Sequence, residues 1–273
     1  MTLKIRQLLI ICTVLFVPLA MQAQFGFSHE VGIIAGPTQF RSDFGQRYNE
    51  ENNIGNTGYG IGLIHYINFS YRADCNCYTA DNYFNDHFKL RSEISYNKTQ
   101  LNHFGEWVNP SRTGIDARRL RAHSGEAENF DVGMQLEYFP LSIRAFSSHT
   151  GGWAPFVSLG AHYTLANPKQ YTTFARSGTI SDENVFNPDN IYAPWIAASG
   201  GEYPINTDPI NTWSVVTSIG TRYKLTILSD LMIDLRFQYY FSDWIDGLNH
   251  KLPSNKMNDV LVWLNVGYIY YLD

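Results

Sequence analysis

The sequence predicts an all-β fold, an eight-stranded antiparallel up-and-down transmembrane β-barrel with long outer loops. Eight stretches alternate apolar and polar residues with a period of two, which places successive side chains on opposite faces of a strand. The segments between them are alternately long and short, as in barrels with long outer loops and short periplasmic turns. Aromatic residues make up 15% of the 273 residues and charged residues 16%, whereas soluble domains carry roughly 25% charged residues.

The first two expected strands have the least regular patterns. In the first, residues 30–40, Pro37 lies near the end, which suits a rim or an edge of the sheet. In the second, residues 58–71, glycines on the polar face leave room for bulky groups from across the barrel. His65 interrupts the apolar face of this strand, which indicates either a bulge or a position near the membrane interface.

The alternation is clearest in the third expected strand, residues 87–96. Phe88 and Leu90 share one face of this strand, and Lys89 and Arg91 share the other. The remaining five strands repeat this division into an apolar row and a polar row. They are expected at residues 130–138, 157–165, 213–225, 231–242 and 260–272.

The connections between the strands differ in length and composition. Long polar segments follow the first, third, fifth and seventh strands, at residues 41–56, 99–127, 166–211 and 243–258. Shorter connections follow the second, fourth and sixth strands, at residues 72–86, 140–152 and the tight turn Ser229-Asp230. Five prolines predict little regular structure in the third long segment: Pro168, Pro188, Pro194, Pro204 and Pro209.

The period of two alone leaves open which face of each strand meets water. A soluble lipocalin-like barrel or a sandwich would turn the apolar rows inward and the charged rows outward. The charged rows are sparse and the apolar rows are unbroken, which favours a membrane barrel with its apolar face against lipid. Outward aromatic residues collect at strand ends, for example Tyr239 with Phe241 and Tyr268 with Tyr270, as in the aromatic girdles of membrane barrels.

The N-terminus predicts export to the bacterial outer membrane. Lys4 and Arg6 precede an apolar run at residues 8–20, and Ala23 suits a cleavage site. We therefore expect a cleaved signal peptide at residues 1–23 and an outer-membrane β-barrel domain at residues 24–273. An N-terminal anchor helix is the alternative, although the apolar run is short for one.

Two cysteines remain after the expected cleavage, Cys75 and Cys77, in the motif Asp-Cys-Asn-Cys-Tyr. An exported protein meets an oxidising compartment, so they are a possible disulfide or thiol pair, although a bridge across one residue is strained. A loop staple or two free thiols is the simplest interpretation. A redox switch, a metal clip and an intermolecular link are the functional alternatives, and two sulfur atoms are half of a zinc site.

Charged side chains on the inward rows predict a network of ion pairs. The lumen of an eight-stranded barrel is just wide enough for its own side chains to fill. An unpaired charge there is costly, so pairing is expected, with an ion or proton path as the alternative. Together with Glu30, the expected ion-pair plug consists of Lys89, Arg91, Glu93, Asp131, Glu137, Arg222, Lys224, Asp234 and Arg236.

A basic cluster lies in the second long segment of a chain whose net charge is −5. On an outer loop it could hold lipopolysaccharide phosphates, because the arginine fork matches phosphate geometry, or it could dock an acidic partner. The alternative is a solvated loop face with Asp116 and Glu126 as internal partners. The cluster consists of Arg112, Arg118, Arg119, Arg121 and His123.

The sequence predicts a protein that is not an enzyme. His103, His123 and Asp116 share one outer segment, but nothing in the sequence places them in register for catalysis. Gly58-Tyr59-Gly60-Ile61-Gly62 is a strand with glycines on one face, and it is not a dinucleotide fingerprint. His250 and Asp243 in the fourth outer segment are no better placed. We expect no cofactor, no metal and no nucleic-acid partner.

Three motifs carry a resemblance to a known family. They are QFGFSHEVG at residues 24–32, YRADCNCY at residues 71–78 and YFNDHFKLRSE at residues 83–93. With them the chain resembles an uncharacterised flavobacterial outer-membrane β-barrel family. More remotely, Glu30-Val31-Gly32 and the glycine-bearing second strand resemble the barrel component of the type IX secretion machinery of Bacteroidota. Neither resemblance implies catalytic residues.

These resemblances imply a structural role: an anchor or docking partner in a larger outer-membrane complex, in secretion or assembly. The expected partners are outer-membrane lipids and an outer-membrane or periplasmic protein. A surface barrel that binds or modifies lipid or lipopolysaccharide through the basic cluster is the first alternative. A narrow pore is the second.

Overall fold

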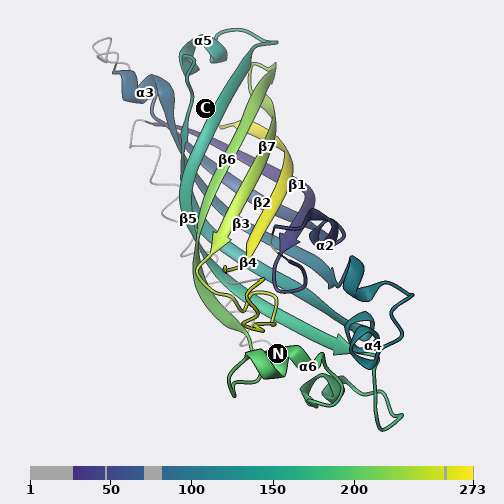
Figure 1. Ribbon diagram of the computed structural model, residues 1–273. Coiled ribbons are helices and arrows are strands. Elements are labelled where there is room, and N and C mark those ends of the chain that lie inside the picture. The colour runs from purple at the N-terminus through teal and green to yellow at the C-terminus, as the bar shows by residue number, and fades with distance from the viewer. Residues whose placement is uncertain (1–26, 47, 71–81, 255–256, 273) are drawn as a thin grey trace, which may run out of the picture.

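The computed structural model is a closed barrel in which each strand pairs with the next in the chain and the last pairs with the first (Figure 1). It describes residues 27–46, 48–70, 82–254 and 257–272. All eight neighbouring pairs are antiparallel, so the predicted fold class is confirmed. The strands are β1 Ser28–Arg41, β2 Thr57–Asn68, β3 Phe88–Asn102, β4 His123–Tyr138, β5 Trp153–Thr172, β6 Ile210–Thr226, β7 Ser229–Tyr240 and β8 Val260–Tyr271.

The connections that follow β1, β3, β5 and β7 gather at one end of the barrel, which we call the outer end because it holds the longest connection, residues 173–209. Among the described residues, short helices lie in three of these connections and in two connections at the inner end (Figure 1). At the outer end they are α2 Glu50–Asn53, η2 Glu106–Val108, α4 Ile115–Ala122, η3 Asp182–Phe186 and α6 Ala193–Ala198. At the inner end they are α3 Tyr83–His87 and α5 Ile143–Ser147. Among the described residues, no helix is long and apolar enough to cross a membrane.

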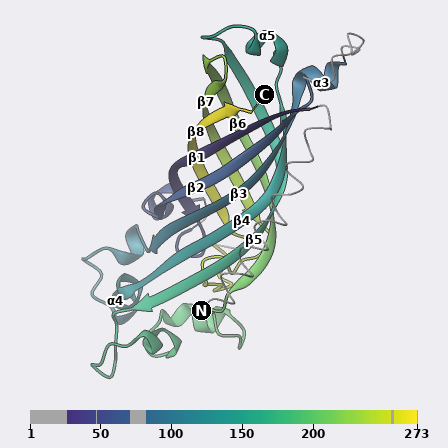
Figure 2. The same ribbon diagram turned by 180° about the vertical axis from the view of Figure 1, so that it is seen from behind.

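Strands β3, β4 and β5 extend beyond the apolar alternation at the outer end, where they form a taller wall (Figure 2). In this extension the outward side chains form four ion pairs of 2.8–3.0 Å between two lysines and two glutamates. The sequence pattern ended these strands too early because it followed apolar residues, and apart from Tyr171 the outer face of the extension is polar. The four residues, which we call the outer charged quartet, are Lys98, Glu126, Glu128 and Lys169.

The predicted turn at Ser229-Asp230 is wrong by two residues. The turn between β6 and β7 lies at residues 227–228, and Ser229 and Asp230 begin β7. Asp230 accepts a hydrogen bond from the Tyr271 hydroxyl at 2.7 Å and pairs with Lys224 at 3.3 Å. Asp230 is therefore part of the lumen, and Ser229-Asp230 resembles a turn signal only in the sequence.

The prolines of the third long segment allow more regular structure than predicted. Pro168 lies inside β5, opposite Ala127 of β4. The pairing of β5 with β6 stops at Ala166, so the missing N–H of Pro168 costs no hydrogen bond on that side. Pro194 lies in the first turn of α6, where an N–H has no helical partner in any case.

His65 marks no bulge, because β1 and β2 pair in unbroken register around it. Its Nε2 lies 3.0 Å from Nδ1 of His29, and the two rings stack at 5.2 Å between centroids. This pair lies near the inner end of the barrel, since His29 is the second residue of β1.

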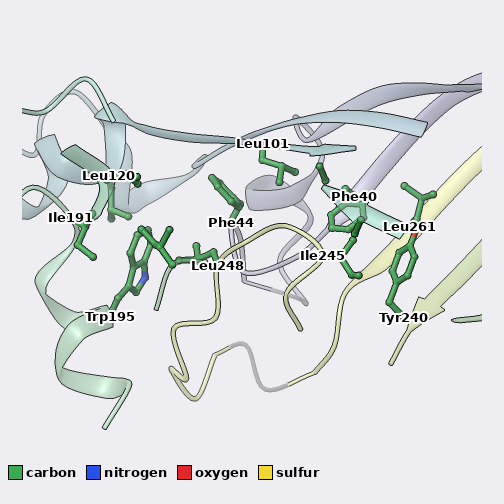
Figure 3. Close-up of a cluster of buried hydrophobic side chains, with 14 residues drawn as sticks. Phe40, Phe44, Leu101, Leu120, Ile191, Trp195, Tyr240, Ile245, Leu248 and Leu261 are labelled. Carbon is green, nitrogen blue, oxygen red and sulfur yellow. The ribbon is translucent and has the colours of Figure 1, made fainter. Parts of the chain in front are cut away.

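The outer connections fold together into a second apolar core, which we call the outer cap: residues 42–56, 103–122, 173–209 and 241–259, apart from 47, 255 and 256. Figure 3 shows Trp195, Phe44 and Leu248 of these connections packed in one cluster with Phe40 and Tyr240 from the strand ends. All five side chains are at most 2% exposed. The outer mouth of the barrel is therefore covered by a packed layer.

Candidate functional site

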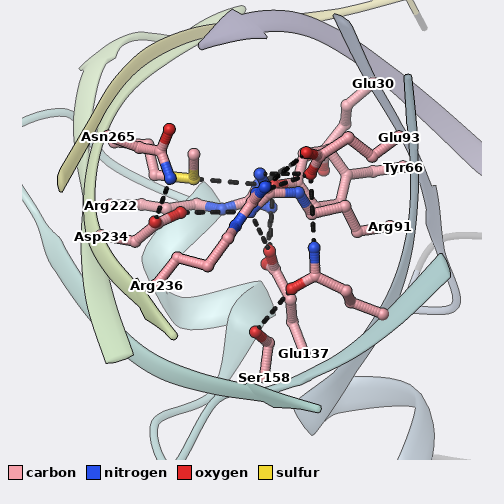
Figure 4. A network of polar contacts seen from close by, with 12 residues as sticks. Glu30, Tyr66, Arg91, Glu93, Glu137, Ser158, Arg222, Asp234, Arg236 and Asn265 are labelled. Atoms are coloured by element: carbon pink, nitrogen blue, oxygen red, sulfur yellow. Dashed lines mark hydrogen bonds and ion pairs between the residues drawn. The ribbon is translucent and has the colours of Figure 1, made fainter. Parts of the chain in front are cut away.

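The middle of the lumen is filled by buried ion pairs (Figure 4). Arg236 donates to both carboxylate oxygens of Glu93, at 2.6 and 2.7 Å. Arg91 contacts the same carboxylate at 2.8 Å and Asp234 at 3.1 Å. A two-pronged arginine–carboxylate contact is among the stronger hydrogen-bond arrangements in proteins. Strands β3 and β7 are thereby joined across the barrel.

A second group of ion pairs lies closer to the inner end. Arg222 bridges Glu30 at 2.7 Å and Glu137 at 3.0 Å, and Lys89 contacts Glu30 at 2.5 Å. The Tyr66 hydroxyl also donates to Glu137, at 3.0 Å. The sequence pattern did not predict Tyr66 as a member of the plug, because an aromatic residue in a strand counts as apolar in the alternation.

Asp131 lies apart from the arginines. Its carboxylate accepts hydrogen bonds from neutral groups: Thr164 at 2.5 Å, Gln238 at 2.8 Å and Asn97 at 3.1 Å. The structure thus places all ten predicted lumen residues inside the barrel, each at most 2% exposed, but it divides them into layers. Asp131 belongs to a neutral layer that lies between the arginines and the outer cap.

Aromatic rings close the inner mouth beneath the lysines. The connection from β4 to β5, with α5, brings Phe139 and Phe146 across the opening, where they join a buried apolar cluster. Lys89 Nζ lies 5.6 Å from the centre of the Phe139 ring, and Lys224 Nζ lies 3.6 Å from that of Tyr271. A cation over an aromatic face is stabilised by the ring quadrupole, and more so when water is excluded.

The outside of the barrel is apolar along its middle. Ile33, Leu63, Met134, Leu159 and Ile219 are each at least 53% exposed, whereas the charged residues of the inward rows, such as Arg91, Glu93 and Arg236, are buried inside. This arrangement is the inverse of a soluble barrel, and lipid is the solvent that makes it stable. The protein is an outer-membrane β-barrel. Its exterior contacts lipid acyl chains, as predicted, and the soluble alternatives are excluded.

Comparisons with known proteins find likeness only among solved structures. No protein-family model and no curated protein matches the chain. Neisserial surface protein A is 12% identical with a TM-score of 0.44, over 89% of this chain and 96% of that one. Ail of Yersinia pestis, solved with the heparin analogue sucrose octasulfate, is 11% identical with a TM-score of 0.41, over 90% and 99%. OprG of Pseudomonas aeruginosa is 11% identical with a TM-score of 0.41, over 90% and 97%.

The basic cluster does not form one phosphate-binding surface. Its segment is the helix α4, which was expected to be a loop, and the helix directs the arginines to different sides. Arg119 is buried, pairs with Asp116 at 3.0 Å and donates to the carbonyl oxygen of Asp189 at 2.6 Å. Arg121 donates to carbonyl oxygens of the preceding turn, at 3.0 Å to Asn109. These two guanidinium groups hold the outer cap together.

The other members of the cluster are also separated. Arg112 pairs with Glu106 and stacks on Trp107, 4.6 Å from the ring centre, while Arg118 is exposed. The expected partner Glu126 belongs to the outer charged quartet and pairs with lysines. The fifth member, the buried His123, contacts another histidine.

A pair of histidines lies at the centre of the outer cap. Nδ1 of His103 donates to the carbonyl oxygen of Phe44 at 2.9 Å, because a carbonyl oxygen can only accept. In the neutral ring Nε2 is then the acceptor, and it receives the hydrogen of His123 Nδ1 at 2.9 Å. Trp195 packs against both rings and stacks on His250, with centroids 5.7 Å apart. Sequence reasoning found these histidines but could not pair them.

The other predicted site residues do not join the histidine pair. Asp116 pairs with Arg119 and therefore does not orient His103. Among the described residues, no group of three or more histidine, cysteine or acidic side chains is arranged to hold a metal ion. Cys75, Cys77 and the signal peptide expected at residues 1–23 lie outside the described residues.

The outer cap is expected to lose stability in acid. Burial lowers the pKa of His103 to about 3 and that of His250 to about 4. The unfolded state therefore binds more protons below pH 6.5, and each histidine costs about 3 kcal/mol by pH 4. Burial raises the pKa of Asp246 to about 7, so this group acts in the opposite direction and offsets part of the loss.

This acid sensitivity is measured by tryptophan fluorescence and limited proteolysis of the folded barrel between pH 7 and 4. His103→Phe is expected to reduce the change, because one of the groups that takes up a proton is removed. His149→Phe is the matched control, since His149 is exposed at the inner end. An unchanged acid response in His103→Phe would contradict the assignment.

Proposed function

We propose that the protein is a non-conducting anchor of the outer membrane that docks a partner protein through its outer cap. The observation that carries the first part is the filling of the lumen. Aromatic rings cover the inner mouth, buried ion pairs occupy the middle, and the outer cap covers the other mouth. We propose that the ion pairs act as a plug, since Arg91, Arg222 and Arg236 are each 0% exposed.

Exposed apolar side chains on the outer cap support the second part. Tyr48 is 88% exposed, Ile54 62% and Ile180 65%, and all three lie in connections at the outer end, away from the lipid-facing middle of the barrel. Apolar groups exposed to water outside the membrane favour contact with another protein. The resemblance of the first two strands to a type IX secretion component supports a partner in a secretion or assembly complex.

Planar-bilayer recording tests the plug. The purified barrel, whose folding is checked by a shift in gel mobility on boiling, is expected to insert without unitary current if the ion pairs and the two covers block the lumen. Insertion is verified by recovering the protein from the same membranes. Stable ohmic openings of the wild-type protein would contradict the proposal and favour the narrow pore.

Photo-crosslinking in cells tests the docking. A photoreactive residue at Ile180 is expected to give a discrete protein adduct. The same residue at Leu159, which is 63% exposed on the lipid-facing side, is the matched control and is expected to give none. If neither Ile180 nor Ile54 yields a protein adduct, the outer cap is not a docking surface.

A further inference from the structure

The outer cap contains a pocket of about 180 Å³ that the anchor role does not use. Its walls come from all four outer connections, so it forms only when the cap folds. Trp107, Tyr192 and His103 contribute ring surfaces, and Asn52, Gln46 and Ser254 contribute neutral polar groups. From this combination we propose that the pocket binds a neutral saccharide unit at the cell surface.

The aromatic side of the pocket offers flat apolar surface to a ligand. Trp107 is 47% exposed although it lies in the 3-10 helix η2 of a folded segment, and Tyr192 is partly exposed. An exposed tryptophan face suits the C–H face of a pyranose ring, which is apolar and of similar size. Arg112 covers part of this indole and is itself paired with Glu106, so the ring is held in place.

The polar side of the pocket contains an amide that faces the cavity. Asn52 is 5% exposed, and within the described part of the chain its side chain makes no hydrogen bond. Because its amide atoms are accessible from the cavity and make no hydrogen bond to any described residue, they are free to bond to a ligand or to water. An amide donates and accepts at once, which matches the vicinal hydroxyl groups of a sugar.

Gly105 makes room for this amide. Its backbone has φ +89°, and a Cβ built there would lie 2.0 Å from Oδ1 of Asn52. A larger residue at position 105 would therefore be strained and would displace the amide from the pocket. The positive φ and the close approach thus both serve the placement of Asn52.

The charges around the pocket favour a neutral ligand. No lysine or arginine is among the described residues that line it. The lining carboxylate of Asp43 accepts the backbone N–H of His250 at 3.0 Å. A sulfate, phosphate or carboxylate would therefore lose its hydration without gaining a cation. A neutral hydroxyl group loses far less hydration free energy than an ion, and Asn52, Gln46 and Ser254 can replace its hydrogen bonds to water.

Isothermal titration calorimetry of the folded barrel in detergent tests the proposal. The probes are the methyl glycosides of glucose, galactose and mannose, compared with glucuronic acid, a sulfated glucose and indole. Saturable binding of at least one methyl glycoside is expected, at least tenfold tighter than that of the charged sugars. Binding of indole or of charged sugars alone, or no saturable binding, would overturn the proposal.

Variants locate the binding in the pocket. Asn52→Leu and Trp107→Ala are each expected to weaken glycoside binding at least tenfold. Tyr48→Ala is the matched control, because Tyr48 is an exposed aromatic residue of the outer cap that does not line the pocket. The heat-modifiable gel shift confirms that each variant folds. Folded Asn52→Leu and Trp107→Ala proteins with unchanged affinity would overturn the assignment, whatever the outcome for conductance or docking.

Discussion

Replacement of Glu93 by glutamine is expected to destabilise the barrel by about 3–5 kcal/mol, the cost of leaving a buried charge unpaired. Glu93 takes two contacts from Arg236 and one from Arg91, and all three side chains are buried. Glutamine keeps the shape of the side chain but removes the charge that balances two guanidinium groups. The measurement is urea or guanidinium unfolding of the barrel in lipid vesicles.

Two further variants separate the charge from the packing. Glu128→Gln makes the same change in the outer charged quartet, where the side chain is 18% exposed, and is expected to cost about 1 kcal/mol or less. Glu93→Leu combined with Arg236→Met removes an ion pair as a unit and is expected to cost less than Glu93→Gln alone. If Glu93→Gln and Glu128→Gln lower the free energy of unfolding by the same amount, water reaches the charged groups of the lumen.

Replacement of Trp195 by alanine is expected to loosen the outer cap by about 3–5 kcal/mol, as for other large buried aromatic residues. Trp195 is 2% exposed and contacts the rings of His103, His123, Tyr192 and His250. Because these contacts lie outside the strands, the barrel itself is expected to keep its heat-modifiable gel shift. Limited proteolysis is expected to cut the outer connections faster.

The matched control for this variant is Trp153→Ala. Trp153 is 60% exposed at the inner end of β5, so its removal leaves the outer cap unaltered. Equal protease resistance of Trp195→Ala and the wild-type protein would show that the cap does not depend on its central ring.

The strands and the lumen residues could be predicted because both follow from the period of two. Every strand buries one row and exposes the other, so Lys89, Arg91 and Glu93 point inward together once lipid is assigned to the apolar row. The partners could not be predicted. Arg91 reaches Asp234 across the barrel, 143 residues away, and the pairing depends on the stagger of the strands.

The contacts within the outer cap could not be predicted from the sequence for another reason. Its contacts join four connections that have no common period, as in the pair His103 and His123 or the approach of His250 to Trp195. Arg119 is the clearest example of a position that the sequence does not predict. In the sequence it is one of several neighbouring cations, yet the fold buries it against Asp116 and a carbonyl oxygen.

The taller wall of β3, β4 and β5 makes the barrel asymmetric when it is viewed along the membrane normal. Lys98, Glu126, Glu128 and Lys169 face outward on this flank, beyond the apolar alternation of the strands. A cylinder with one raised, charged flank cannot rotate freely against a neighbour without changing its contacts. In a lateral contact with a neighbouring protein, this flank would therefore present charged groups where the rest of the barrel presents apolar ones.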